Sequence, residues 1–282
     1  MSGALDLWEA LLLGTIEGAT EFLPISSTGH LTITEKLLGY EIDAPDVTAF
    51  TAIIQLGAIL ATVVYFRRDL VRILGALWEG VRHSDRRTGP EWRFAVALVI
   101  GSIPIGIVGL LFKDTIETTL RNLWFVGGAL ILWSGVMWFA DSTARLDRGE
   151  EQVTRKDTLI IGIVQCLSLI PGVSRSGATM SAGLLRGLDR VTVTRLSFFL
   201  AMPALTAATL LQIATEHSNI SNGVGWPATI VATLTSFVVA YGVVAWLLRY
   251  IAGHTYTVFI VYRVLLGALV LALVATGAVA AT

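Results

Sequence analysis

Six stretches of about 20 mostly apolar residues limit the possible folds of this chain more than any other feature. A helix of that length crosses the hydrocarbon core of a bilayer. Of the 282 residues, 54% are hydrophobic and 15% are charged, whereas a soluble domain carries about 25% charged residues. The sequence therefore predicts an all-α polytopic membrane protein with six transmembrane helices, near residues 48–66, 94–112, 123–140, 196–214, 227–248 and 257–276.

Two further hydrophobic regions are interrupted by polar residues. The region 7–38 contains EGATEFLPISSTGH, and the region 158–186 contains SLIPGVSRSGAT. Each resembles two half-helices joined by a polar turn. Irregular backbone at membrane depth is tolerated only inside protein or beside a water-filled cavity. We therefore predict that both regions are re-entrant helix hairpins.

The lysines and arginines are distributed unevenly if each hairpin returns to the side that it entered. Fifteen of the twenty basic residues then share one side, in the stretches 67–93, 141–157, 186–195 and 249–256. The opposite side holds only Lys36, Lys113 and Arg121. Because basic loops are retained in the cytoplasm, this count predicts that the arginine-rich side is cytoplasmic and that both termini lie outside.

The two interrupted regions also resemble each other. Pro24 is followed closely by SSTG, and Pro171 is followed closely by SRSG. Three spanning helices follow each hairpin, so the second copy enters the membrane from the opposite face, as in inverted-topology repeats. We predict one integral-membrane domain over 1–282, in which a cytoplasmic linker separates two repeats; the three parts are 1–141, 142–157 and 158–282.

Two glutamates in the first polar stretch are costly at membrane depth. Glu17 and Glu21 are four residues apart and share one helix face. Each carboxylate costs about 2.5–3.5 kcal/mol inside a bilayer. They lie either near the interface, in water, or in a polar cavity beside a cation or a basic side chain. Hard oxygen ligands suit Mg²⁺, which often combines one or two carboxylates with substrate phosphate.

Hydroxyl residues and a histidine follow these glutamates. Ser26, Ser27 and Thr28 stand where a helix would begin, so at least one is expected to cap it. The N–H groups of such a helix start also attract an anion, which makes Ser26 and Thr28 candidate phosphate ligands. Ser27 needs a base to become a nucleophile, and His30 lies three residues further on. Structural roles for His30 stay open at this point.

The second polar stretch supplies positive charge. Arg175 stands between Ser174 and Ser176, with Thr179 beyond. Its fork of donors matches phosphate oxygens, and an arginine at membrane depth indicates a functional site. Arg263 is the other intramembrane arginine, which either joins this site, pairs with a glutamate or reaches the interface. Nucleophile, base, arginines and carboxylates together are typical of phosphoryl transfer.

Both polar stretches resemble the signatures of the undecaprenyl-diphosphate phosphatase family, also called the bacitracin-resistance protein family. The family motifs E-x-x-x-E-F-L-P-x-S-S-T-G-H and P-G-x-S-R-S-x-x-T are complete here. The resemblance implies that a polyprenyl diphosphate loses its terminal phosphate, and that the lipid carrier is recycled for cell-envelope synthesis. It implies Ser27 as nucleophile with His30 as its acid/base partner, or instead a water activated by His30, and a metal and charge network at Glu17 and Glu21. It implies that the diphosphate is held by Ser174, Arg175, Ser176, Thr179 and Arg263.

The resemblance carries further expectations. They are a divalent cation (Mg²⁺ or Ca²⁺), a site that opens to the extracytoplasmic side of the plasma membrane, and a homodimer. The partners expected are the lipid substrate and the bilayer, whereas the net charge of −1 gives no support for nucleic acid. A transporter or flippase of polyprenyl phosphate is the alternative, because broken helices in inverted repeats are typical of transporters.

Overall fold

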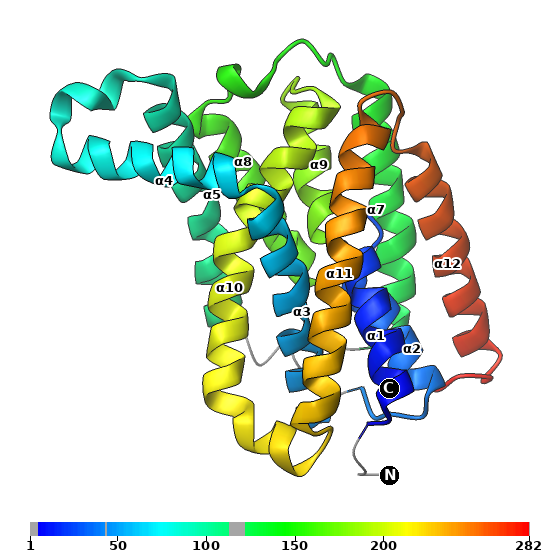
Figure 1. The fold of residues 1–282 in the computed structure, drawn as a ribbon. Helices are drawn as coiled ribbons and strands as arrows, with labels where there is room; N and C mark the ends of the chain where they lie inside the picture. The colour runs from blue at the N-terminus through cyan, green and yellow to red at the C-terminus, as the bar shows by residue number, and fades with distance from the viewer. Residues whose placement is uncertain (1–4, 43, 113–121, 282) are drawn as a thin grey trace.

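Six helices among the described residues are long and apolar enough to cross a membrane. The computed structural model describes residues 5–42, 44–112 and 122–281, so Lys113 and Arg121 lie outside the described residues. Figure 1 shows the long helices with their axes roughly along one direction. All six predicted spans are confirmed as helices, namely α3 (Pro45–Tyr65), α5 (Pro90–Leu111), α7 (Leu123–Thr143), α10 (Arg190–Asn222), α11 (Trp226–Ile251) and α12 (Thr257–Ala275).

Proline opens three of these spanning helices. Pro45, Pro90 and Pro227 lie in the first turns of α3, α5 and α11. A proline lacks the N–H group that would have no partner at a helix start, and its backbone is already close to helical. The bounds of five spanning helices lie within four residues of the predicted ones, whereas α10 begins six residues earlier and ends eight residues later than predicted.

Two pairs of short helices stand where the sequence is interrupted. The first pair is α1 (Leu7–Thr20) and α2 (Ser27–Leu37); the second is α8 (Arg155–Gln165) and α9 (Arg175–Leu185), with the short 3-10 helix η3 (Cys166–Leu169) between them. None of the four α-helices exceeds 14 residues, which is too short to span a bilayer alone. The re-entrant placement of both pairs and the division into repeats stay predictions.

Glycines allow the short helices and the spanning helices to approach closely. A Cβ atom on Gly57 of α3 would lie 2.1 Å from the carbonyl oxygen of Thr233 in α11. A Cβ atom on Gly162 of α8 would lie 2.1 Å from the carbonyl oxygen of Gly101 in α5. Close backbone contact at small residues is the usual way in which helices associate within membranes. These contacts fix α8 and α11 against the first half of the chain.

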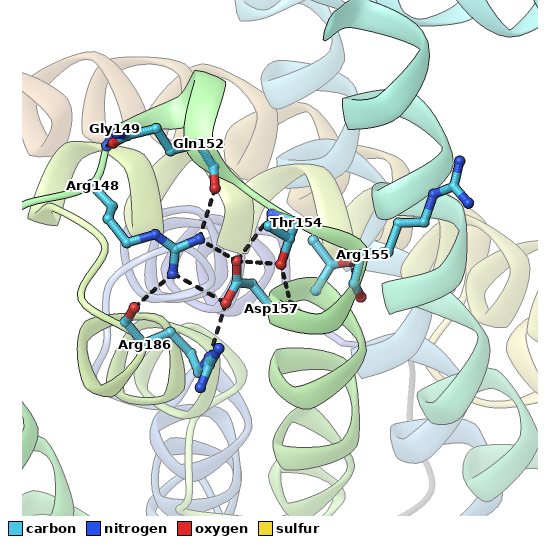
Figure 2. Close-up of polar contacts among 8 residues, drawn as sticks. Arg148, Gly149, Gln152, Thr154, Arg155, Asp157 and Arg186 are labelled. Atoms are coloured by element: carbon cyan, nitrogen blue, oxygen red, sulfur yellow. Dashed lines mark hydrogen bonds and ion pairs between the residues drawn. The ribbon is translucent and has the colours of Figure 1, made fainter. Parts of the chain in front are cut away.

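A charged cluster holds the start of α8, as Figure 2 shows. Asp157 accepts hydrogen bonds from Arg148 at 2.6 Å and from Arg186 at 2.9 Å, and its carboxylate also caps the helix through Thr154. Burial alone would raise the pKa of Asp157, but the hydrogen bonds from Arg148, Thr154 and Arg186 hold it well below its ordinary value. The cluster ties the linker before α8 to the end of α9.

One helix departs from the bundle. α4 (Arg67–Arg82) runs across the axes of the spanning helices and projects to one side, followed by the 3-10 helix η1 (Ser84–Thr88) (Figure 1). Its start is joined to the rest of the molecule by ion pairs of Arg72 with Glu150 in η2 (Glu150–Gln152) and of Arg195 with Asp69. This arm is therefore anchored to the end of the bundle that carries the basic loops.

Candidate active site

Two matching turns open α2 and α9. Ser26 and Ser174 are the residues before these helices, and each has a φ of 74°, in the left-handed region that serine rarely adopts. The Oγ of Ser26 accepts the N–H of Gly29, and the Oγ of Ser174 accepts the N–H of Gly177. Both serines are therefore caps. A backbone in this region persists only where its surroundings hold it.

Arg263 of α12 lies behind both turns and contacts each of them. Its guanidinium donates to the carbonyl oxygen of Pro24 at 3.3 Å, and to those of Gly172 and Val173 at 2.9 and 3.1 Å. It also donates to Ser134 Oγ at 3.1 Å, and the side chain is fully buried. The structure thus places Arg263 as a brace between the turns, and it does not line the cavity described next.

A polar cavity of about 230 Å³ lies in front of the two turns. The predicted site residues that line this cavity are Glu21, Ser26, Ser27, Thr28, Ser174 and Arg175. Residues of α3 and α10 form further parts of the wall, including Thr48, Thr51, Gln55, Leu205 and Gln212. The two sequence motifs, some 150 residues apart, therefore share one cavity.

Glu21 is the centre of the charge arrangement. One carboxylate oxygen accepts the hydroxyl of Ser27, and the other lies 2.5 Å from Nη2 of Arg175. The Nε and Nη1 groups of Arg175 are buried and have no acceptor among the described residues. A buried donor without a partner costs about 1–3 kcal/mol. An anion in the cavity would satisfy these donors.

Glu17 lies behind Glu21 and is completely buried. Neither of its oxygens has a hydrogen-bond donor among the described residues. It interacts electrostatically with Glu21 and with Arg175, so Glu17 and Glu21 share one arginine. The excess of negative charge and the orphaned oxygens fit a hard divalent cation. No three acidic, His or Cys side chains of the described residues converge on one point, so phosphate or water oxygens would complete its ligands.

His30 has partners other than Ser27. Its Nδ1 lies 2.7 Å from the carbonyl oxygen of Ser26, which only accepts, so Nδ1 carries the proton. In the neutral ring Nε2 accepts the hydroxyl of Tyr262 at 2.6 Å. The two rings lie parallel, with centroids 5.5 Å apart. The predicted contact between His30 and Ser27 is absent from this conformation, and His30 does not line the cavity.

The hydroxyl groups of Ser176 and Thr179 bond backbone carbonyl groups. Ser176 Oγ donates to the carbonyl oxygen of Leu23 at 2.7 Å and shares a hydrogen bond with Ser174 Oγ. Thr179 Oγ1 lies 2.9 Å from the carbonyl oxygen of Arg175 in the preceding turn of α9. Both hydroxyls are thus occupied by protein groups. Their predicted contact with the diphosphate stays a prediction.

The sequence reasoning missed the polar wall on α3. Thr48, Thr51 and Gln55 follow one another at intervals of three and four residues, which places them on one helix face. Thr51 Oγ1 donates to Glu35 of α2 at 2.7 Å. Polar residues at this spacing inside a predicted span are a signal that would have identified them. They extend the site from the motif turns to a spanning helix.

Comparisons with known proteins agree with these motifs. A model of the family described as bacitracin resistance protein BacA matches residues 10–269. Undecaprenyl-diphosphatase 3 of Frankia casuarinae is 66% identical over 99% of this chain and 100% of its own length. Undecaprenyl-diphosphatase of Cutibacterium acnes is 50% identical over 96% of this chain and 98% of its own, and undecaprenyl-diphosphatase 1 of Streptomyces avermitilis is 48% identical over 97% and 98%.

Proposed function

This chain belongs to the bacitracin resistance protein BacA family, and we propose that it hydrolyses a long-chain polyprenyl diphosphate of the undecaprenyl type. The products are the lipid monophosphate and inorganic phosphate. The relatives carry the name undecaprenyl-diphosphatase and align over nearly the whole chain. The reaction would recycle the lipid carrier used in building cell-envelope glycans such as peptidoglycan.

The observation that carries this proposal is the pair of unsatisfied donors on Arg175. Nε and Nη1 are buried beside a cavity that also contains the Ser27 hydroxyl. A guanidinium presents its donors in a fork that matches phosphate oxygens. The N-termini of α2 and α9 add N–H groups and positive dipole ends to the same wall. An anionic diphosphate head is the ligand that satisfies all of these groups together.

Ser27 is the nucleophile in this proposal, and Glu21 accepts its proton. The hydroxyl of Ser27 is already hydrogen-bonded to Glu21, so no rearrangement is needed for the transfer. Ser27 Oγ forms a bond to the terminal phosphorus while the bond to the bridging oxygen breaks, and the polyprenyl monophosphate leaves. Water then cleaves the phosphoserine. A direct attack by water is the alternative, and trapping a phosphoserine on Ser27 separates the two routes.

His30 has a supporting role in the same proposal. Its protonated Nδ1 holds the carbonyl group of Ser26, the residue before the nucleophile, and Tyr262 fixes the opposite ring nitrogen. An acid/base role for His30 requires the ring to turn from Tyr262 toward the cavity. Replacement of Tyr262 by Phe would release the ring, so it changes the pH dependence of the rate if His30 acts as acid or base.

A divalent cation, Mg²⁺ or Ca²⁺, is proposed at the glutamates. Glu17 and Glu21 would hold it, and it would neutralise charge on the diphosphate when bound. Chelator is expected to stop phosphate release, and added Mg²⁺ or Ca²⁺ to restore it. The isosteric Glu17→Gln variant is expected to weaken this dependence. If chelator does not change phosphate release, Arg175 would be the principal source of positive charge at the diphosphate.

The location proposed is the plasma membrane, with the site open to the extracytoplasmic side and both termini outside. The support is the side on which fifteen of the twenty basic residues gather. A homodimer is also proposed, from the family resemblance. Labelling of terminal cysteines by a membrane-impermeant reagent in intact cells tests the orientation, and cross-linking in membranes tests the dimer.

Transport or flipping of polyprenyl phosphate is the second candidate function. Matching broken helices in two halves of a chain are typical of transporters with a central binding site. The hydrogen bond between Ser27 and Glu21 favours hydrolysis, because transport requires no nucleophile. Translocation of labelled polyprenyl phosphate by a Ser27→Ala variant in liposomes would establish transport. Its absence, beside normal phosphate release by the wild type, would leave hydrolysis alone.

A further inference from the structure

The arm formed by α4 begins directly at the end of a spanning helix. α3 ends at Tyr65 and α4 starts at Arg67, so Phe66 alone forms the corner. Figure 1 shows α4 lying across the axis of the bundle, beside the end of α3. A helix that leaves a spanning helix at such a corner stays at the depth where the spanning helix ends.

The exposed side chains of α3 and α5 show that α4 lies where the apolar surface of these spanning helices ends. On α3, Leu60 and Val64 are both more than 40% exposed, so the outward apolar surface continues to the corner. On α5, which follows the arm, outward apolar side chains begin at Val99 and continue through Ile103. Arg93, one to two turns earlier, is exposed and charged. The arm thus lies between the apolar surface and the charged end of the molecule.

α4 itself has an apolar stripe that the protein leaves uncovered. The stripe consists of Val71, Leu74, Trp78 and Val81, which are between 60% and 73% exposed. Their spacing of three and four residues places them on one face of the helix. The adjoining face packs on the protein through Ile73 and through Gly80, which lies against Trp92. The helix is therefore fixed in rotation, and its stripe faces outward.

Arginines flank the stripe. The guanidinium of Arg82 lies 3.9 Å from the centre of the Trp78 ring. Arg68 is exposed in the first turn of the helix, and neither Arg68 nor Arg82 forms an ion pair among the described residues. A helix with an apolar face, a tryptophan and basic flanks is typical of one that lies in the membrane interface. Free arginines there are attracted to anionic lipid headgroups.

We propose that α4 is an interfacial helix that inserts the stripe Val71, Leu74, Trp78 and Val81 into the lipid leaflet on the basic side of the protein. Arg68 and Arg82 then contact anionic phospholipid headgroups. Exposed apolar side chains stand directly before the arm, at Val64 of α3, and again after it, from Val99 of α5, which argues for lipid as the occupant of the stripe. This surface is separate from the cavity and does not depend on the proposed hydrolysis.

Spin labels on the two faces of α4 test this proposal. The background is Cys166→Ser, and single cysteines replace Leu74 or Val81 on the stripe, Glu79 on the charged face of the helix, and Ile103 on α5 as the hydrocarbon reference. The labelled proteins are placed in nanodiscs of phosphatidylcholine with phosphatidylglycerol. Dissolved oxygen concentrates in hydrocarbon and nickel-EDDA in water, so the relaxation that each causes reports the surroundings of the label.

The proposal predicts that oxygen dominates at positions 74, 81 and 103, and that nickel-EDDA dominates at 79. Strong nickel-EDDA relaxation at both stripe positions would overturn it, because the arm would then lie in water. Weak relaxation by both reagents at 74 and 81 would also overturn it, since the stripe would be covered by protein, such as a second copy. Replacing phosphatidylglycerol by phosphatidylcholine is expected to increase nickel-EDDA access at 81, and no change would refute the headgroup contact.

Discussion

Two arginines near the cavity, Arg175 partly buried and Arg263 fully buried, are used in opposite ways. Arg175 gives one N–H to Glu21 and keeps two donors unpaired beside the cavity. Arg263 distributes its donors over the carbonyl groups of both motif turns and over Ser134. From the residue type alone the two are equivalent, and both are expected to bind phosphate. From their partners we propose that Arg175 binds substrate and that Arg263 positions the turns.

Replacing each arginine by glutamine should separate these roles. Arg175→Gln removes donors to phosphate and leaves Glu21 without its ion-pair partner, so phosphate release should fall on the order of 10²–10³-fold and the melting temperature should fall as well. Arg263→Gln leaves buried carbonyl groups without donors, at about 1–3 kcal/mol each, so the melting temperature should fall clearly. Phosphate release and thermal unfolding in the same detergent are the two measurements.

Binding of a non-hydrolysed anion adds a second readout for Arg263. The Arg263→Gln variant, below its melting temperature, should still be stabilised by added pyrophosphate, whereas Arg175→Gln should not. An Arg263→Gln variant with the stability of the wild type but no response to pyrophosphate would show that Arg263 contacts the ligand. The brace assignment would then be wrong.

At the scale of elements, the two motif turns are the least predictable part of the fold. Ser26 and Ser174 both adopt a φ of 74°, which local sequence does not favour for a serine. A cap by one of Ser26, Ser27 and Thr28 was expected, and the structure confirms it for Ser26; the matching cap by Ser174 was not predicted. Their left-handed backbone depends on α12, which supplies Arg263 from far along the chain, so no local pattern could reveal it.

The start of α8 gives an element-scale prediction. Asp157→Asn removes the negative charge that forms ion pairs with Arg148 and with Arg186, both of which are partly exposed. The expected loss of stability is about 2–3 kcal/mol. Breaking a fully buried ion pair costs about 3–5 kcal/mol, and the loss is smaller here because water screens the two arginines. Thermal unfolding of wild type and variant at pH 7 measures it. Equal melting temperatures would show that the cluster does not hold the helix.

The same carboxylate predicts how stability changes with pH. The folded-state pKa of Asp157 is held below its ordinary value of about 3.9. Its stabilising contribution is therefore complete above about pH 4 and is lost as the pH falls further toward the folded-state pKa. The wild type should lose this part of its stability in acid. Asp157→Asn should show a smaller loss over the same range.

At the scale of the whole molecule, the spanning helices were predictable and their contacts were not. A run of about twenty apolar residues is typical of a helix that spans a bilayer. Such runs identify α3, α5, α7, α10, α11 and α12. The motifs also indicated which segments contribute to the site. Tyr262 lies 232 residues from His30, and no pattern in either segment pairs them. Such long-range contacts depend on how the helices pack.

The central claim is that the cavity between the two motif turns removes a phosphate by way of Ser27. The most direct test is the rate of phosphate release from undecaprenyl diphosphate by the purified wild type, by Ser27→Ala and by Thr235→Ala. The last variant loses a hydroxyl that bonds only the backbone of α11. We expect release by the wild type and by Thr235→Ala, and almost none by Ser27→Ala when each protein is assayed below its own melting temperature. Release by Ser27→Ala at the wild-type rate would contradict the claim.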